Sequence, residues 1–376
     1  MTSACDACLR RGHLIGFLAP RIAALLDRPG RRATTLLGLP DGDLIDAVSS
    51  GEGRSASAFL ARFDVRAARR DLNRRELRAV CAHSREYPDR LGGLTDAPAV
   101  LFVAGSAPLA TLREPSVALI GARRATGYGR EVAQELGRGL AVAGVEVVSG
   151  LALGIDAAAH RGSLAGGGSA VAVLAGGADV PYPRTNARLY TRIAERGLVV
   201  SELPPGQRPF RWSFPARNRI MAGLAEMTVV VEAAARSGSL ITSDFAVALN
   251  RPVGAVPGQV TVGVAAGSNE LLRDGAVVVT AVRDVLDELS TLAPGRQWNQ
   301  ESARPPKPPA DLVERALLAA VEAGLGIDGI CATAGLPTRE ARAGLTRLEI
   351  AGLISRDGLG GYRRSAGPVR PDGIAR

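Results

Sequence analysis

The sequence predicts an α/β protein whose core is a parallel sheet, with a small helical N-terminal domain and a C-terminal winged-helix domain. Three observations support this prediction. Short apolar runs alternate with helix-length segments in the middle of the chain, a proline-rich stretch follows near residue 300, and three helical patterns and two strands come after it. With 376 residues, 46% of them hydrophobic, the chain is long enough for about two or three domains.

The first 80 residues predict a helical domain. Apolar residues recur with helical spacing over residues 14–26, 36–39 and 43–48, and no chemistry is visible among them. The opening stretch is polar and charged and lacks the apolar region of a secretory signal, and no apolar run is long enough to span a bilayer. We therefore expect a cytoplasmic protein with no membrane partner.

The middle of the chain predicts the sheet. The expected strands are short apolar runs at residues 100–103, 117–120, 145–148, 170–174, 198–200, 228–231, 253–256 and 277–279. Most intervals between them are long enough for a helix. This alternation is typical of a parallel sheet that is covered by helices on both faces.

The last part of the chain predicts a linker and a winged helix. The Arg-Pro-Pro-Lys-Pro-Pro run at residues 304–309, within a linker over 293–309, can neither continue a helix nor enter a sheet. The elements expected after it are helices at 311–321, 327–334 and 337–348 and two strands within 353–362 around Asp357 and Gly358. Arg339, Arg342 and Arg347 fall on the third helix. Winged helices bind duplex DNA in some proteins and protein in others, so both roles stay open.

The charge of the chain favours an anionic partner. The sequence has 46 basic and 37 acidic residues, a formal net charge of +9, and Lys307 is the only lysine. Guanidinium groups can both bind phosphate and stack on bases, so nucleic acid is the first candidate. The codon preference of a GC-rich genome explains the excess of arginine over lysine equally well.

The cysteines predict neither a disulfide framework nor a metal site. Cys5 and Cys8, with His13 nearby, resemble half of a zinc site, but no second cysteine or histidine pair follows. Cys81 and Cys331 are expected to be ordinary small core residues.

The loops that follow the expected strands are where a ligand of a parallel sheet binds. In the first, residues 121–129, glycines permit close approach of an anion and Arg123 can clamp it. The loop is a weak match to a dinucleotide fingerprint. The next strand ends in Ser149 and Gly150 where that fingerprint has an acidic residue, which argues against NAD.

The second and third loops invite catalytic and binding interpretations. Ser149 and His160 suggest a hydrolase, but the nucleophile elbow Gly-x-Ser-x-Gly is missing and Asp156 is expected to cap a helix. The third loop combines Tyr182, Arg184 and Asn186, which suits a stacked base and its phosphate. The alternative is that Tyr182 packs the loop and Asn186 caps the next helix.

Two later segments are further candidates for binding nucleic acid or an anion. Residues 210–220 interleave arginines with two phenylalanines and a tryptophan, which is the strongest indication of single-stranded nucleic acid from the residues alone. Residues 237–242 form a small, hydroxyl-rich turn at a helix start, which is a further place for an anion.

Taken together, these motifs resemble the DprA/Smf family of DNA-processing proteins over residues 87–280. They are Val-Ala-Leu-Ile-Gly-Ala-Arg at 117–123, Ser-Gly-Leu-Ala at 149–152, Gly-Ile-Asp at 154–156, Ala-His at 159–160, Tyr-Pro at 182–183, Ser-Glu at 201–202, Phe-Pro-Ala-Arg-Asn-Arg at 214–219, Ser-Gly-Ser-Leu-Ile-Thr at 237–242 and Pro-Gly at 257–258.

The resemblance implies an extended Rossmann-like domain that binds single-stranded DNA, protects incoming DNA, forms a homodimer and helps to load the RecA recombinase in natural transformation or recombination. It implies no enzyme activity and no cofactor. The domains expected on this basis are residues 1–80 (helical), 81–290 (Rossmann-like), 291–310 (linker), 311–365 (winged helix) and 366–376 (tail).

The resemblance also implies a DNA pocket on Arg123, Arg184, Arg217, Asn218 and Arg219. Many relatives have lysine where Arg184 stands, which keeps the charge but changes its geometry. With the candidate residues of the other loops, the expected DNA-binding set is Gly121, Arg123, Ser149, Gly150, Arg184, Asn186, Phe214, Arg217, Asn218, Arg219, Ser237, Gly238 and Ser239.

Two other functions compete with this one. Nucleotide phosphoribohydrolases of the same fold group use a Gly-Gly-x-Gly-Thr-x-x-Glu turn, but here Phe245 stands where the catalytic glutamate is required. The other is a regulator whose winged helix binds duplex DNA while the Rossmann-like domain senses a nucleotide.

Overall fold

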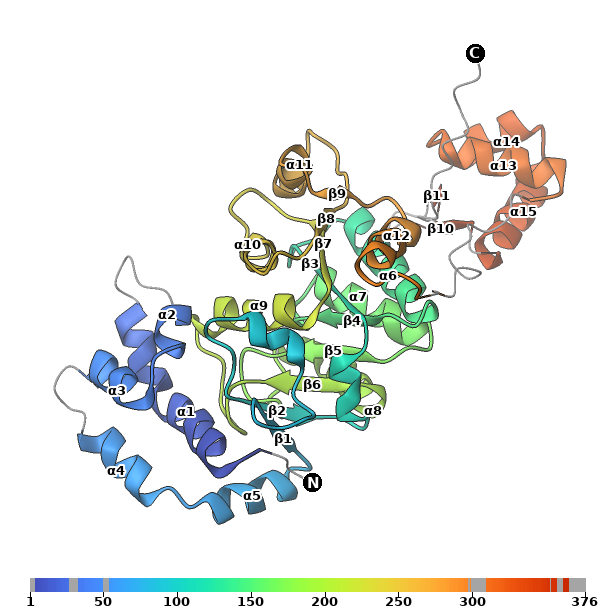
Figure 1. Cartoon of the computed structure of the whole chain (residues 1–376). Coiled ribbons are helices and arrows are strands. Elements are labelled where there is room, and N and C mark those ends of the chain that lie inside the picture. Colours follow the sequence, from blue (N-terminus) through green and yellow to red (C-terminus); the bar gives the residue numbers. More distant parts are fainter. Residues whose placement is uncertain are drawn as a thin grey trace. The chain divides into compact units, whose positions relative to one another are not determined.

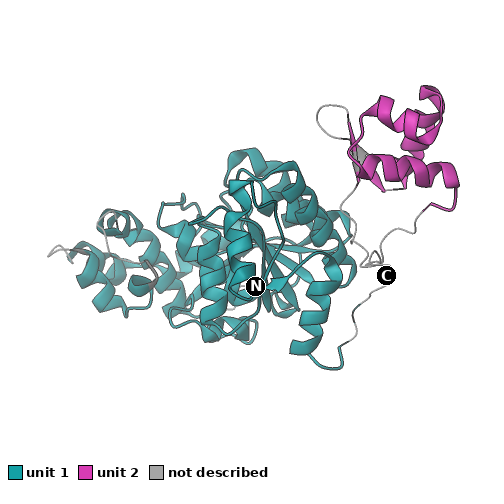
Figure 2. Cartoon of the chain, turned by 90° about the horizontal axis from the view of Figure 1, so that it is seen from above, with its two compact units in different colours: residues 1–299 teal, residues 300–376 magenta. Residues whose placement is uncertain are grey.

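The computed structural model describes residues 4–26, 33–49, 54–296, 298, 309–351, 353–356 and 361–364. The chain divides into two compact units, Met1–Asn299 and Gln300–Arg376 (Figure 2). Lys307 and most of the predicted linker, the predicted turn at Asp357 and Gly358, and the predicted tail lie outside the described residues.

A nine-stranded sheet forms the centre of the first unit. Its order is β1-β2-β6-β5-β4-β3-β7-β8-β9 (Figure 1). The strands are β1 (Arg78–Cys81), β2 (Val100–Ala104), β3 (Ser116–Gly121), β4 (Glu146–Ser149), β5 (Ala170–Val173), β6 (Leu198–Ser201), β7 (Met227–Glu232), β8 (Val253–Ala255) and β9 (Val277–Val278). Neighbouring strands from β6 to β9 run parallel, which confirms the predicted α/β class.

Two further strands join the sheet by antiparallel pairing. β2 pairs antiparallel with β6, and β1 pairs antiparallel with β2. β1 was not predicted, because its residues follow closely on an arginine-rich helix and were counted with the helical N-terminal region. This strand brings residues 78–81 into the sheet, so the helical region of the chain ends before it.

Alternation of side chains along the strands gives the sheet two apolar faces. In β5, Ala170 and Ala172 pack into one core and Val171 and Val173 into the other. The first core includes residues of α7 (Ile155–Ala165) and α8 (Ala187–Arg196). The second includes residues of α9 (Ser213–Leu224) and of two short 3-10 helices, η1 (Asp89–Gly93) and η2 (Leu109–Arg113).

The remaining helices of the sheet domain connect successive strands or follow the last strand. They are α6 (Gly127–Val142), α10 (Leu240–Ala248), α11 (Ala266–Arg273) and α12 (Val282–Leu292), with short 3-10 turns η3 (Arg184–Asn186) and η4 (Gly263–Ala265). Gly137 of α6 lies so close to the Ala159 carbonyl of α7 that a Cβ would collide with it. Glycine at this position therefore lets α6 pack closely on α7.

Within the described part of residues 4–74, five helices precede the sheet, as the apolar spacing predicted for the first three. They are α1 (Asp6–Leu26), α2 (Ala33–Leu37), α3 (Asp41–Ser49), α4 (Arg54–Arg62) and α5 (Val65–Arg74). Leu14, Leu18 and Ile22 of α1 are fully buried in a core that also contains Trp212, next to α9. Among the helices of the described residues, none is both long and apolar enough to cross a membrane.

The second unit is a winged helix, as predicted. It consists of α13 (Leu312–Glu322), α14 (Ile327–Ala334), α15 (Thr338–Ile350) and an antiparallel pair, β10 (Ile354–Arg356) and β11 (Tyr362–Arg364). Asp311 caps α13 by accepting a hydrogen bond from the Val313 N–H, 2.7 Å away. On α15, Arg339 and Arg342 are exposed, while Arg347 forms an ion pair with Glu314, 2.6 Å apart.

Candidate nucleic-acid interface

The order of the strands creates a crevice beside β3. From β3 the chain builds the sheet outward to β6, and it then returns to the other side of β3 with β7. Ligands of open α/β sheets bind at such a reversal, beyond the carboxyl ends of the strands. A pocket of about 480 Å³ opens there, lined by residues that follow β3 and β7 and by the start of α9.

The pocket brings together eight of the thirteen predicted DNA-binding residues. They are Gly121, Arg123, Phe214, Arg217, Asn218, Ser237, Gly238 and Ser239. They come from three segments, 121–123, 214–218 and 237–239, and the first lies about 90 to 120 residues before the other two, so the sheet topology brings it to them.

Three flat groups lie in a row at the edge of the pocket. The guanidinium carbon of Arg123 lies 5.1 Å from the ring centroid of Phe214, and that ring lies 5.5 Å from the ring of Tyr182. Arg123 and Tyr182 are exposed, Tyr182 to 46%. A nucleic-acid base can stack on exposed surfaces of this kind, and the charge of Arg123 suits a phosphate beside it.

The loop after β7 forms the opposite wall. The hydroxyl oxygens of Ser237 and Ser239 lie 2.7 Å apart, and the side-chain amide of Asn218 donates to the Gly238 carbonyl at 3.1 Å. A Cβ at Gly238 would meet no atom within 4 Å, so this wall borders open space. Asn218 thus fixes the position of the loop by its amide group.

Arg217 is built into the floor of the pocket. Its side chain is almost fully buried, and its Nη1 donates to the carbonyl oxygens of Gly150, at 2.6 Å, and of Val173. Its Nη2 lies 3.8 Å from the carboxylate of Asp156. A Cβ at Gly150 would collide with this guanidinium, which explains the glycine. Most of the hydrogen-bonding capacity of Arg217 is therefore used by the protein itself.

Arg219 lies outside the pocket. It is completely buried, its Nη2 donates to both carboxylate oxygens of Glu202 at 2.8 and 2.9 Å, and its Nε forms an ion pair with Asp96 at 2.9 Å. It also donates to the Ala216 carbonyl. The resemblance placed this arginine in the DNA pocket, but the structure uses it to join α9 to the segment before β2.

Ser149 and Asn186 are also used inside the fold. The Ser149 hydroxyl is fully buried and donates to the Leu119 carbonyl of β3 at 2.6 Å. The Asn186 amide donates to the Leu151 carbonyl at 2.9 Å and makes no capping bond to α8. Both side chains hold loops of the crevice in place and do not line the pocket.

Three further arginines belong to the surface around the crevice. Arg184, which follows Tyr182 by two residues, is exposed. Arg124 lines the pocket and Arg236 directly precedes Ser237, and both are exposed, yet the sequence analysis named neither. Arg236 has a φ of 60°, which is uncommon for a residue other than glycine and turns the loop after β7. No residue pattern around Arg236 indicated this conformation.

The start of α6 is occupied by a side chain of the protein. The carboxylate of Glu232, at the end of β7, accepts hydrogen bonds from the Thr126 N–H at 2.8 Å and from the Thr126 hydroxyl at 2.6 Å. In dinucleotide-binding sheets a pyrophosphate uses the first helix N-terminus in this way. A carboxylate there repels phosphate, which supports the prediction against NAD.

The groups that suggested a hydrolase are not placed for catalysis. Burial lowers the pKa of His160 to about 3, so the ring is neutral near pH 7 and, being fully buried, out of reach of a substrate. Asp156 does not cap α7, because Gly154 holds that position. Its carboxylate instead accepts the N–H groups of Gly150 and Ala152 at 3.1 and 3.3 Å.

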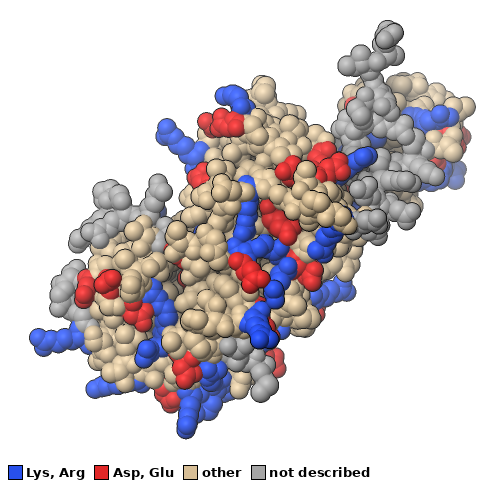
Figure 3. All heavy atoms as spheres, viewed as in Figure 1, with Lys and Arg blue, Asp and Glu red and all other residues tan. Residues whose placement is uncertain are grey.

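Within the aromatic and basic segment at residues 210–220, some side chains face the pocket and others pack inside the protein. Phe214 faces the pocket, whereas Trp212 is buried and donates its indole N–H to the Ala19 carbonyl of α1 at 3.2 Å. The segment therefore owes part of its composition to packing against the N-terminal helices. In Figure 3, the Arg side chains of the described residues (blue) lie among Asp and Glu (red) on the visible face and do not form one unbroken basic patch.

The cysteines differ from the prediction. Cys81 and His83 form the second pair that the sequence analysis did not find, and they lie beside Cys5 and Cys8. His13 is turned away from the thiols, with its Nδ1 2.8 Å from the Leu9 carbonyl oxygen. The spacing concealed the pair, because more than 70 residues separate the two halves and the second contains only one cysteine.

Two family models match the chain. The model of DNA recombination-mediator protein A matches residues 78–290, and that of the DprA winged helix domain matches residues 301–358. A DprA relative from Mycobacterium tuberculosis (strain H37Rv) is 44% identical over 269 residues, which is 69% of this chain and 68% of its own.

Two solved structures resemble this one. DprA from Streptococcus pneumoniae superimposes with a TM-score of 0.60 at 33% identity, covering 75% of this chain and 96% of its own. DNA processing protein A from Helicobacter pylori, solved to describe its single-stranded DNA binding mode, gives a TM-score of 0.51 at 29% identity and covers 57% of this chain and 96% of its own. The sheet topology, the loops that meet in the crevice and the winged helix agree with these matches, and the chain belongs to the DprA/Smf family of DNA-processing proteins.

Proposed function

We propose that this chain binds single-stranded DNA in the crevice between β3 and β7, without catalysing a reaction, and presents the strand to the RecA recombinase. The observation that carries the proposal is the row formed by Arg123, Phe214 and Tyr182 at the edge of the pocket. Stacking surfaces next to an exposed cation are the usual means of binding a single strand without reading its sequence. The single-stranded DNA binding of the Helicobacter pylori relative supports the same function.

The other residues of the crevice fit roles in this interaction. The exposed guanidinium groups of Arg123, Arg124, Arg184 and Arg236 can contact successive phosphates, since they lie on three loops at the same edge of the sheet. Arg217 contributes positive charge from the floor of the pocket, and its hydrogen bond to the carbonyl of Gly150 holds that residue in place. We propose residues 81–290 as the DNA-binding domain on this basis.

The partners follow from the family resemblance. We propose that the protein acts in the cytoplasm as a homodimer, so that two crevices hold one strand for loading of RecA. Sedimentation at micromolar concentration tests the dimer, and RecA-dependent strand exchange with and without the protein tests the loading. In the winged helix, Arg339 and Arg342 are exposed and suit either duplex DNA or an acidic protein surface.

The first experiment measures binding of the full chain to a fluorescent thymidine oligonucleotide and to its duplex counterpart across a salt series. We expect preference for the single strand. Arg123→Ala should weaken binding and flatten the slope of log K against log salt by about 0.7, the contribution of one phosphate contact on a single strand.

Arg196→Ala is the matched control. Arg196 is also an exposed arginine, but it ends α8 two residues before β6 and so lies at the opposite edge of the sheet. Its removal should leave the salt slope of single-strand binding unchanged. Equal binding of single strand and duplex, or equal losses in both variants, would refute the crevice as the site. Hydrolysis of a nucleotide by the wild-type protein would favour the phosphoribohydrolase alternative.

A further inference from the structure

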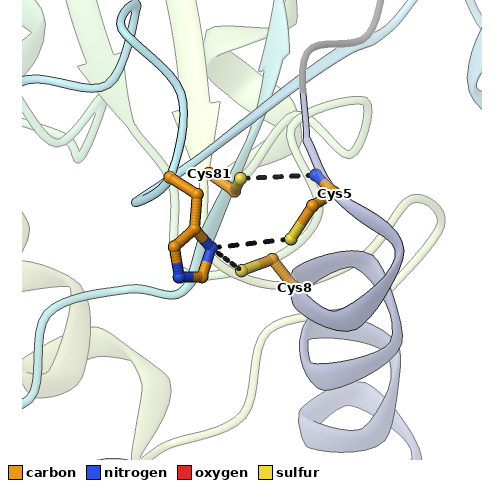
Figure 4. A group of neighbouring side chains, drawn as sticks. Cys5, Cys8 and Cys81 are labelled. Carbon is orange, nitrogen blue, oxygen red and sulfur yellow. Dashed lines mark hydrogen bonds between the residues drawn. The ribbon is translucent and has the colours of Figure 1, made fainter.

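Four side chains with metal-binding atoms converge where the N-terminus meets the sheet. Cys5 and Cys8 stand at the start of α1, Cys81 ends β1, and His83 follows two residues later. Their ligand atoms all lie within 4.8 Å of one another. Figure 4 shows the sulfurs of Cys5 and Cys8 directed at one imidazole nitrogen and the sulfur of Cys81 beside the backbone nitrogen of Cys5.

The distances suit a tetrahedral metal ion. The Nδ1 of His83 lies 3.3 Å from the sulfur of Cys8 and 3.5 Å from the sulfur of Cys5. Zinc binds thiolate sulfur at about 2.3 Å and imidazole nitrogen at about 2.0 Å, so tetrahedral ligand atoms are separated by about 3.5–3.8 Å. The largest separation, 4.8 Å, requires a shift of only about 1 Å to reach that range.

The backbone around the four residues is held independently of any ion. The Ala4 N–H donates to the Ala79 carbonyl of β1 at 3.1 Å, and the Cys5 N–H donates to the sulfur of Cys81 at 3.3 Å. Arg69 of α5 donates to the Ala4 carbonyl and to the Asp6 carboxylate, both at 2.8 Å. An N–H directed at a ligand sulfur is a typical second contact of a thiolate that binds a metal.

Two simpler interpretations, packing of core residues and a disulfide, do not account for the arrangement of the four side chains. Cys8 and Cys81 are buried and could serve as small core residues, but packing does not explain why the exposed His83 points its Nδ1 at two sulfurs. A disulfide would use two thiols and leave the third thiol and the imidazole without a role. Three thiolates and one imidazole complete the shell of a structural zinc ion and leave no open position for catalysis.

We propose that Cys5, Cys8, Cys81 and His83 bind one Zn²⁺ ion that joins the start of α1 to β1. The ion would attach the N-terminal helices to the edge of the sheet, at the opposite end of the strand order from β9. This inference does not rest on DNA binding by the crevice.

The test is the zinc content of the full chain, purified without added metal or chelator and measured by mass spectrometry of the element. We expect about one zinc per chain, and loss of nearly all of it in Cys81→Ser and His83→Ala. Cys331→Ser is the matched control, because Cys331 is the remaining cysteine and lies in the winged helix, so its zinc content should equal that of the wild type.

A second measurement covers the case in which Cys81→Ser fails to fold. Replacing zinc by Co²⁺ in the wild-type protein should give the intense visible absorption of tetrahedral cobalt bound to thiolates, and His83→Cys should retain a metal because it keeps four ligands. Absence of both zinc and the cobalt spectrum in folded wild-type protein overturns the proposal. So does a Cys5–Cys8 or Cys5–Cys81 disulfide found by mass spectrometry of the freshly purified chain, or full zinc content in His83→Ala.

Discussion

Two arginine-bearing segments meet at the crevice and use the same side chain in different ways. In α9, Arg217 and Arg219 are buried and their guanidinium groups are bound by carbonyl and carboxylate oxygens of the protein. In the loop after β3, Arg123 and Arg124 are exposed at the pocket. The comparison teaches that a guanidinium can bind a ligand only where the fold leaves its N–H donors unused. A basic composition does not reveal which arginines are bound inside the protein and which are free for a ligand.

The largest effect that this comparison predicts is on folding. Arg219→Ala leaves the carboxylates of Glu202 and Asp96 buried without their counter-charge, and such a change should lower the free energy of unfolding by about 3–5 kcal/mol. Urea denaturation at pH 7, followed by tryptophan fluorescence, measures it. Arg123→Ala, at an exposed position, should stay within about 0.5 kcal/mol of the wild type. Similar losses in the two variants would contradict the distinction.

A smaller loss is expected from the glycine beneath Arg217. In Gly150→Ala, the new methyl group collides with the guanidinium and displaces it from the carbonyls of Gly150 and Val173, at a cost of about 1–3 kcal/mol in unfolding free energy. Gly238→Ala is the matched control in the same pocket, because its Cβ would meet no atom within 4 Å. A Gly150→Ala variant as stable as Gly238→Ala would mean that Arg217 has room to move.

The pH dependence of stability extends the comparison to a buried histidine. Burial, with a contribution from the charge of Arg217, lowers the pKa of His160 from 6.5 to about 3. Below pH 6.5 the His160 ring becomes protonated in the unfolded chain but stays neutral in the folded chain. The free energy of unfolding therefore falls on acidification. This residue should account for about 2 kcal/mol between pH 7 and pH 5.

Denaturation of His160→Gln at both pH values isolates this effect, because His13, which is also largely buried, contributes equally to both proteins. We expect the variant to lose less stability than the wild type as the pH falls. If both proteins lose the same free energy between pH 7 and pH 5, the His160 ring is protonated in the folded state.

The sequence predicted the fold better than it predicted the roles of the side chains. The apolar runs located eight of the nine strands, because a strand buried on both faces leaves a continuous signal. β1 was missed because its short apolar run follows closely on the arginine-rich helix α5 and was counted with the helical N-terminal region. The winged helix was evident from the spacing of its helices and the proline that precedes the third.

The site was predicted only in part, for a physical reason. Motif order identified the loops that meet at the crevice, but burial decides what each side chain does there. Trp212 and Arg219 belong to the aromatic and basic segment and yet pack inside the protein. His83 gave only a weak local signal, because, of its three neighbours in space, only Cys81 is near it in sequence and the other two come from the distant N-terminus.

The smallest predicted effect concerns how Arg123 acts. A flat guanidinium over the Phe214 ring can extend a stack of bases, whereas a lysine at the same place offers only a point charge. Arg123→Lys should therefore weaken single-strand binding by about 0.5–1 kcal/mol, roughly twofold to fivefold. The salt slope should stay that of the wild type, because the number of neutralised phosphates is the same. Phe214→Leu, which keeps an uncharged apolar side chain but removes the ring, should give a comparable loss at the same slope. If Arg123→Lys binds as tightly as the wild type while Phe214→Leu does not, the base stacks on the ring alone, and the guanidinium acts on phosphate only.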